Sequence, residues 1–235
     1  MTTQSLNVVR FLSFELGPDC DMGYIHRTKC PNQHPERYKF GNTDNELTDE
    51  IIVEFWKWCR FSKEFRGIIH WNYYNEPTLY LDRCYRLMTI LKQLDKGQPF
   101  RLLTNKEPTE EMLDKFDLVR FTDYTKEDRM DNRLTTIRGS GKPYYQVDDV
   151  GWCTRGYGWE MPIDFHGNWN LCCSDFRCEE SMGNIFIDDW DTLLKKYIEK
   201  VQSLRWKDES SYNAMPRLCR ACIDTNFYLH RSGGS

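Results

Sequence analysis

Apolar and polar positions follow two different periods along the first half of the chain. Short apolar runs at 8–16, 67–73, 99–105 and 117–124 are typical of buried strands. Between them, the segments 47–65, 79–94 and 110–116 repeat apolar residues every third or fourth position, which indicates amphipathic helices. Thr48 and Thr109 stand where N-caps of two of these helices are expected. Strands that alternate with helices of this length predict βαβ units and a parallel sheet.

The number of these units decides between a complete barrel and a partial one. About four to six units fall short of the eight in a complete TIM barrel. We therefore expect an α/β fold, a partial (β/α) TIM-like barrel of about six strands. After about residue 125 the rhythm changes to short strands, a hairpin with a His-Gly-Asn turn, a helix at 188–206 and a closing cysteine turn. This change predicts a first domain at 1–145, a small cysteine-rich domain at 146–228 and a flexible tail at 229–235.

Charge and targeting signals exclude several classes of protein. The net charge is −4, with 32 basic residues interleaved among 36 acidic ones, so no basic surface for nucleic acid is indicated. No apolar run has the length of a membrane span, and the first residues do not resemble a secretory signal. We therefore expect a cytoplasmic protein. In that reducing compartment the ten cysteines suggest metal or redox chemistry rather than disulfides.

Cysteines in the last third have the spacing of a metal site. Thirteen residues separate Cys153 from Gly167, four more lead to Cys172, and 46 separate Cys172 from the pair Cys219-x-x-Cys222. A C-x-x-C turn presents two thiolates on one side of a bend, where both can reach one metal or cluster. The four thiolates suit an iron–sulfur cluster or, alternatively, a structural zinc ion. Cys173 could replace its neighbour Cys172. By contrast, Cys59 and Cys84 fall within helical patterns and are expected to be buried thiols.

The sequence around these cysteines resembles a known extension. The run MPIDFHGNWNLCC, the following GNI and the closing LCRAC are similar to the SPASM or "twitch" extension of radical S-adenosylmethionine (SAM) enzymes. This resemblance implies that Cys153, Cys172, Cys219 and Cys222 hold one auxiliary 4Fe–4S cluster.

Two short motifs in the first half resemble the SAM-binding motifs of the same family. The NEP sequence after the second strand resembles the family's G-G-E-type motif, and TNK after the third resembles its T-N-G motif. The resemblance implies that Asn75, Glu76 and Pro77 bind the amino group of SAM, with Thr104 and Asn105 beside them. Both motifs follow strands, where barrel-type folds place their chemistry.

The loop after the first strand departs from the family pattern. Radical SAM enzymes normally carry C-x3-C-x2-C there, whereas this loop has Cys20 and Cys30 with His26 between them, as C-x5-H-x3-C. Imidazole can replace thiolate on iron, so His26 is a candidate third ligand of an N-terminal 4Fe–4S cluster. The alternatives are an imidazole on a surface loop and two thiols that bind nothing.

The resemblance predicts a radical SAM enzyme with catalytic residues that the sequence does not identify. Such an enzyme generates a 5′-deoxyadenosyl radical and would modify a peptide, protein or sugar-type substrate, with electrons from a donor such as a flavodoxin or ferredoxin. The alternative is a catalytically inactive accessory or binding protein that keeps only the C-terminal metal site. Whether the loop with Cys20 and Cys30 holds a cluster distinguishes these two hypotheses.

Overall fold

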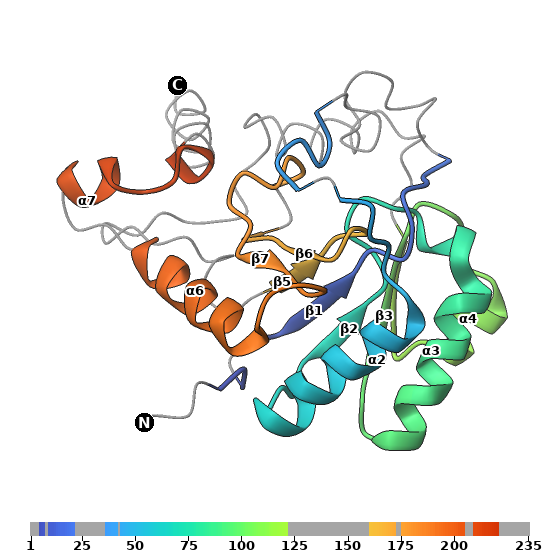
Figure 1. Cartoon of the computed structure of the whole chain (residues 1–235). Coiled ribbons are helices and arrows are strands. Elements are labelled where there is room, and N and C mark those ends of the chain that lie inside the picture. The colour runs from blue at the N-terminus through green and yellow to red at the C-terminus, as the bar shows by residue number, and fades with distance from the viewer. Residues whose placement is uncertain are drawn as a thin grey trace, which may run out of the picture.

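The computed structural model describes residues 5–7, 9–21, 36–41, 43–121, 160–172, 175–204 and 209–220. Its centre is a seven-stranded sheet of order β4-β3-β2-β1-β5-β6-β7 (Figure 1). The strands are β1 (Phe11–Phe14), β2 (Ile68–His70), β3 (Phe100–Thr104), β4 (Leu118–Phe121), β5 (Glu160–Ile163), β6 (Asn168–Trp169) and β7 (Gly183–Asn184). The four pairings that join β4, β3, β2, β1 and β5 are parallel, whereas β6 is antiparallel to both β5 and β7.

Helices α2, α4 and α6 begin where the sequence supplies a capping side chain. Thr48, Thr109 and Asp189 accept hydrogen bonds from the amides of Ile51, Met112 and Thr192. The helical elements are α2 (Asp49–Lys57), the π-helix η3 (Trp58–Ser62), the 3₁₀-helix η4 (Pro77–Tyr80), α3 (Leu81–Leu94), α4 (Glu110–Lys115), α6 (Trp190–Ser203) and α7 (Glu209–Asn213). None of the helices in the described ranges is long and apolar enough to cross a membrane.

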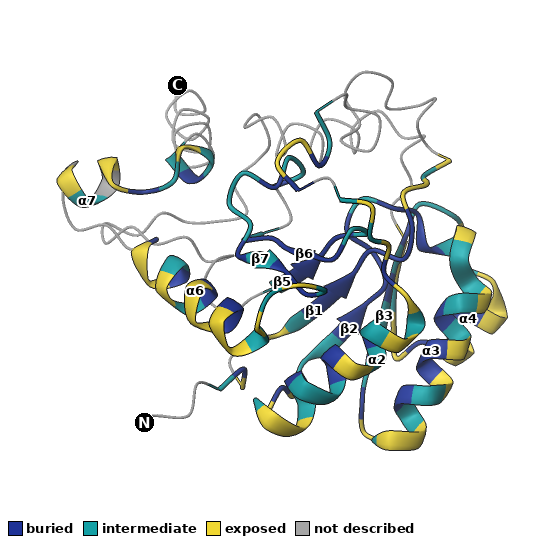
Figure 2. Ribbon diagram, viewed as in Figure 1, coloured by how far each residue is buried: buried dark blue, intermediate teal, exposed yellow. Residues whose placement is uncertain are grey.

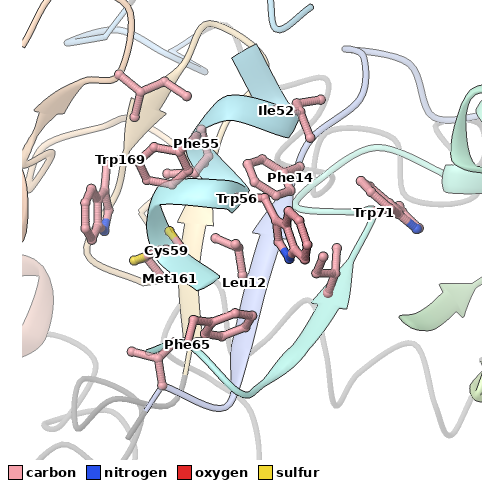
Figure 3. Packing of buried hydrophobic residues seen from close by; sticks show 14 of the residues in the cluster. Leu12, Phe14, Ile52, Phe55, Trp56, Cys59, Phe65, Trp71, Met161 and Trp169 are labelled. Atoms are coloured by element: carbon pink, nitrogen blue, oxygen red, sulfur yellow. The ribbon is translucent and has the colours of Figure 1, made fainter. Parts of the chain in front are cut away.

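One face of the sheet is apolar and carries the core. Leu12 and Phe14 of β1 and Met161 of β5 point toward α2, where Phe55 and Trp56 are fully buried (Figure 3). Helices α3 and α6 add buried leucines to the same core, and their solvent-facing sides are exposed (Figure 2). Since helices α2, α3 and α6 share this one core, it spans the sheet from β3 to the hairpin of β5 and β6.

The opposite face of the same strands is polar. The register aligns Ser13 with His70, and His70 with Arg101. The ring centroids of Phe11 and His70 on this face lie 4.4 Å apart. The Ser13 hydroxyl donates a hydrogen bond to Glu160 Oε1 at 2.7 Å. Parallel sheets are normally apolar on both faces, so this polar face indicates a site rather than a second core layer.

The structure confirms the predicted order of strands and helices and changes some bounds. The strand expected at 8–16 is limited to β1, and the helix expected at 47–65 ends as α2 at Lys57. Beyond Lys57 the chain widens into a π-helix, in which the Lys63 amide donates to the Trp58 carbonyl. Cys59 is buried within this wide turn, as predicted, while Phe61 is exposed.

The hairpin is as predicted, and its position in the sheet is new. Gly167 has a φ of 82° in the turn, a left-handed conformation that favours glycine. Strand β5 pairs with β1, so the hairpin continues the parallel sheet rather than forming a separate layer. A sixth barrel strand and the boundary predicted near 146 both fall within 122–159, outside the described residues, and stay predictions.

Candidate active site

Three segments meet at the carboxyl edge of the sheet, where parallel strands place their functional loops. They follow β1, β2 and β3 and contain, respectively, Cys20, the NEP motif and the TNK motif. The three lie on neighbouring strands because the sheet order places β1 beside β2 and β2 beside β3. Sequence alone predicted each motif but not the contacts between them.

The Glu76 carboxylate joins the two predicted SAM-binding motifs. It is 1% exposed, and Oε1 accepts hydrogen bonds from the Thr78 amide at 3.1 Å and from the Thr78 hydroxyl at 2.8 Å. The Thr104 hydroxyl also donates to Oε1 at 2.8 Å, and the Asn105 amide donates to Oε2 at 2.9 Å. These donors occupy about as many positions as a carboxylate has lone pairs. Glu76 therefore fixes the loops after β2 and β3 as one unit.

The remaining residues of the NEP motif form a tight turn around this unit. Asn75 is buried, and its side chain accepts a hydrogen bond from the Tyr73 amide and donates one to the Trp71 carbonyl. Pro77 is the first residue of η4, with Glu76 as its N-cap. Asn75, Glu76, Pro77, Thr104 and Asn105 therefore lie together, while the contact of this group with a ligand stays a prediction.

The segment with Cys20 is attached to both motifs. The Glu76 amide donates a hydrogen bond to the Asp19 carbonyl at 3.0 Å, and the Tyr80 hydroxyl donates to Asp19 Oδ2 at 2.8 Å. On the other side of Cys20, Asp21 forms an ion pair with Lys106, whose Nζ lies 2.6 Å from Oδ2. Cys20 is thus held between the NEP and TNK loops, and its role as a metal ligand stays a prediction.

Polar atoms without partners line the polar face just below this edge. His70 Nε2 and Asn72 Oδ1 are buried without a hydrogen-bond partner, and the two residues are 3% and 7% exposed. Burial, with a smaller contribution from Arg101, lowers the pKa of His70 to about 3, so the imidazole is neutral at pH 7. A buried polar atom without a partner is costly, and it indicates a place that a polar ligand or water occupies.

The C-terminal cysteine segment contacts the NEP loop. The Tyr73 hydroxyl donates a hydrogen bond to the Cys172 carbonyl at 3.0 Å, so Cys172 lies close to the turn before Glu76. Cys219 is buried in a short helical stretch at 217–220. Cys178 is a buried thiol that donates to Asp164 Oδ2 at 3.1 Å, and burial raises the pKa of this thiol well above its usual range. Cys178 therefore remains protonated.

Most predicted metal ligands fall where the structure gives no description. Cys20, Cys172 and Cys219 are placed, and within the described part of the chain no three His, Cys, Asp or Glu side chains form a metal-binding group. The other candidates are outside the described residues: His26, Cys30, Cys153, Cys173 and Cys222. The ligand sets at both ends of the chain stay predictions.

Two charged residues of this edge were missed by the sequence analysis. Glu15 follows β1 and is fully buried, and Arg37 forms an ion pair with it. A carboxylate directly after a buried parallel strand was the available signal, because such positions meet at one edge of the sheet. For Arg37 no local pattern existed.

No protein-family model matches the chain, and no curated protein sequence matches it. Among solved structures, BtrN in complex with AdoMet and 2-DOIA matches over 90% of this chain and 92% of that chain, with a TM-score of 0.64 and 17% sequence identity. The fold is that of BtrN. BtrN in an open conformation also matches, with a TM-score of 0.58, 17% identity and coverage of 90% and 91% of the two chains. The likeness to BtrN confirms the predicted α/β fold, with a mixed sheet.

Proposed function

We propose that this protein is a radical SAM enzyme. The observation that carries the proposal is the contact network at the carboxyl edge, where Glu76 joins the NEP and TNK loops and its amide binds the segment with Cys20. BtrN, which shares the fold, was crystallised with AdoMet, the ligand expected at this edge. The three motifs therefore have the arrangement that a SAM site beside a cluster needs.

The donor groups fit the expected cofactors. Thiolates such as Cys20 and Cys30, with the His26 imidazole, suit a 4Fe–4S cluster, and a second set at Cys153, Cys172, Cys219 and Cys222 suits an auxiliary one. SAM at Asn75, Glu76 and Pro77, with Thr104 and Asn105, would supply a 5′-deoxyadenosyl radical when reduced. A flavodoxin or ferredoxin is the proposed electron donor.

The chain's own residues orient SAM and keep the site rigid. The Glu76 carboxylate is occupied by hydrogen bonds from the two loops. We therefore assign contact with the amino group of SAM to the backbone carbonyls of this turn. Lys106 and Tyr80 hold the two sides of the Cys20 segment through contacts made by the chain itself. Such preorganisation lowers the entropy cost of binding.

The substrate we propose is a small, hydroxyl-rich molecule of the sugar type. His70 and Asn72 present neutral, unpartnered polar atoms, which suit hydroxyl groups better than charged ones. BtrN was crystallised with 2-DOIA as well as AdoMet, which supports a small substrate over a peptide.

Anaerobic reconstitution tests the enzyme hypothesis. The protein is loaded with iron and sulfide, its iron is counted, and SAM cleavage to 5′-deoxyadenosine is measured with dithionite. We expect about eight irons per chain if two 4Fe–4S clusters form, and about four in a Cys20→Ala, Cys30→Ala variant. Cleavage should occur only in the first protein.

The counts also distinguish the other hypotheses. About four irons in both proteins, without SAM binding, would refute the enzyme and leave the accessory protein. Zinc in place of iron would refute both clusters. A Glu76→Gln variant that keeps its iron and its SAM affinity would refute the claim that the Glu76 carboxylate holds the SAM-binding loops in place.

A further inference from the structure

One buried carboxylate receives hydrogen bonds from three segments around the candidate site. Glu15 is 0% exposed at the carboxyl end of β1. Its Oε1 accepts from Arg37 Nη2 and from the Tyr74 amide at 3.0 Å. Its Oε2 accepts from the Tyr38 hydroxyl at 2.7 Å and from the Phe165 amide at 3.0 Å. Hydrogen bonds to an ionised acceptor are about twice as strong as neutral ones.

The donors come from three segments that are far apart in sequence. Arg37 and Tyr38 follow the loop that contains the candidate ligands of the N-terminal cluster. Tyr74 lies two residues before Glu76, and Phe165 lies in the hairpin that leads to Cys172. Glu15 therefore contacts both ends of the Cys20 loop, the SAM-binding turn and the C-terminal cysteine segment.

Arg37 extends this network to the residues beside Cys20. Its side chain is 6% exposed, and Nη1 donates a hydrogen bond to the Pro18 carbonyl at 2.9 Å. Burial alone would lower the pKa of Arg37, but Glu15 together with Tyr38, Tyr74 and Asp164 outweighs it, and the net shift is upward. The guanidinium therefore joins Glu15 to the chain two residues before Cys20.

Burial and hydrogen bonding keep the Tyr38 hydroxyl of the network protonated, so that it can donate to Glu15. The pKa of Tyr38 is raised by burial and by Glu15, so its hydroxyl stays protonated. Asp164 is buried nearby, and burial together with the Glu15 charge raises its pKa. Arg37 forms an ion pair with Glu15 at the centre of this network.

We propose that Glu15 is a positioning residue that holds the Cys20 segment against the SAM-binding turn and links both to the C-terminal cysteine segment. The contact between the Asp19 carbonyl and the Glu76 amide does not involve Glu15 directly. Asp19 lies next to Pro18, whose carbonyl accepts a hydrogen bond from Arg37. Loss of the Glu15 charge therefore releases Arg37, then Pro18, and then the Asp19–Glu76 contact. The part that concerns SAM rests on the proposed function.

Amide hydrogen exchange on the metal-free chain tests the linkage without any cofactor. In Glu15→Gln we expect at least tenfold faster exchange at Tyr74 and Phe165, whose amides bind the carboxylate, and also at Glu76, which does not. Tyr38→Phe removes one donor and keeps the ring, so it should produce a smaller change at the same amides.

The matched control is Asp95→Asn. Asp95 also accepts from an arginine, Arg60, and from a backbone amide, that of Gly97, but it lies in the turn before β3, away from the carboxyl edge. At equal loss of melting temperature, this control should leave exchange at Glu76 unchanged. Equal exchange at Glu76 in Glu15→Gln and Asp95→Asn would overturn the proposal, because a general loss of stability would then explain the effect.

SAM affinity of the iron-loaded chain provides the second readout. We expect Glu15→Gln to bind SAM at least tenfold more weakly than the wild type, and Asp95→Asn to bind it normally. Unchanged affinity in Glu15→Gln together with unchanged exchange at Glu76 would refute the positioning role while the enzyme hypothesis stands. If Glu15→Gln accelerates exchange at Glu76 but the wild type binds no SAM, the enzyme hypothesis is refuted and the positioning role stands.

Discussion

The buried histidine of the polar face predicts a specific dependence of stability on pH. His70 has a pKa of about 3 in the folded protein, because burial disfavours its charged form. The unfolded chain has an ordinary histidine pKa of about 6.5 and therefore binds more protons between these two values. Stability must then fall as the pH falls below about 6.5. From pH 7 to pH 5 the loss works out at about 2 kcal/mol.

The variant His70→Phe isolates this effect. Phenylalanine keeps the ring contact with Phe11 at 4.4 Å, and no hydrogen bond is lost at Nε2, which has no partner. Urea unfolding of both proteins, followed by tryptophan fluorescence at pH 7, 6 and 5, gives the difference in their free energies of unfolding. We expect the wild type to lose about 2 kcal/mol relative to the variant over this range.

The result that refutes the reasoning is a difference that stays constant between pH 7 and pH 5. A second variant, Arg101→Met, removes only the smaller of the two causes of the low pKa, so its loss of stability between pH 7 and pH 5 should stay close to that of the wild type. A proton NMR titration in which the His70 ring signal moved with a midpoint near pH 6.5 would contradict both predictions.

Three further predictions concern stability. Burial raises the pKa of Asp175 to about 6, so the folded state binds more protons than the unfolded chain. Wild-type stability should therefore fall by about 2 kcal/mol as the pH rises from about 4 to about 6, whereas Asp175→Asn lacks this slope in urea unfolding. Leu12 in β1 is 0% exposed, so Leu12→Ala should lower the free energy of unfolding by about 2–5 kcal/mol. Ile187 is 75% exposed, so Ile187→Ala should lower it by less than about 0.5 kcal/mol. Equal melting temperatures of the two variants would contradict this. Gly67→Ala places a Cβ 2.3 Å from the Arg10 carbonyl oxygen and should destabilise by about 1–3 kcal/mol in thermal melts, while Gly97→Ala, 3.3 Å from a side-chain oxygen, should not.

The opposite signs of the His70 and Asp175 effects have a practical consequence. Both act between about pH 4 and pH 6, and they partly cancel in the wild type. The free energy of unfolding of the wild type over this range therefore changes less than either group alone would make it change. Only the single variants separate them.

The sequence by itself determined the local features of this protein. The order of strands and helices, the caps at Thr48 and Thr109 and the glycine turn at Gly167 all followed from patterns a few residues long. Burial of Cys59 and Cys84 followed in the same way from helical periodicity. Such features depend on backbone propensity and on the spacing of apolar side chains, and both can be recognised without knowledge of distant contacts.

Only the tertiary structure decided how the site is assembled. Pairing of β5 with β1 places the C-terminal hairpin beside the candidate SAM site, and no pattern near either strand indicated that pairing. The role of Glu15 depends on the Phe165 amide, 150 residues away, and on Arg37, 22 residues away. The motif residues could be predicted because each follows a strand, whereas a buried carboxylate finds its donors only when the folded sheet brings distant segments to the same edge.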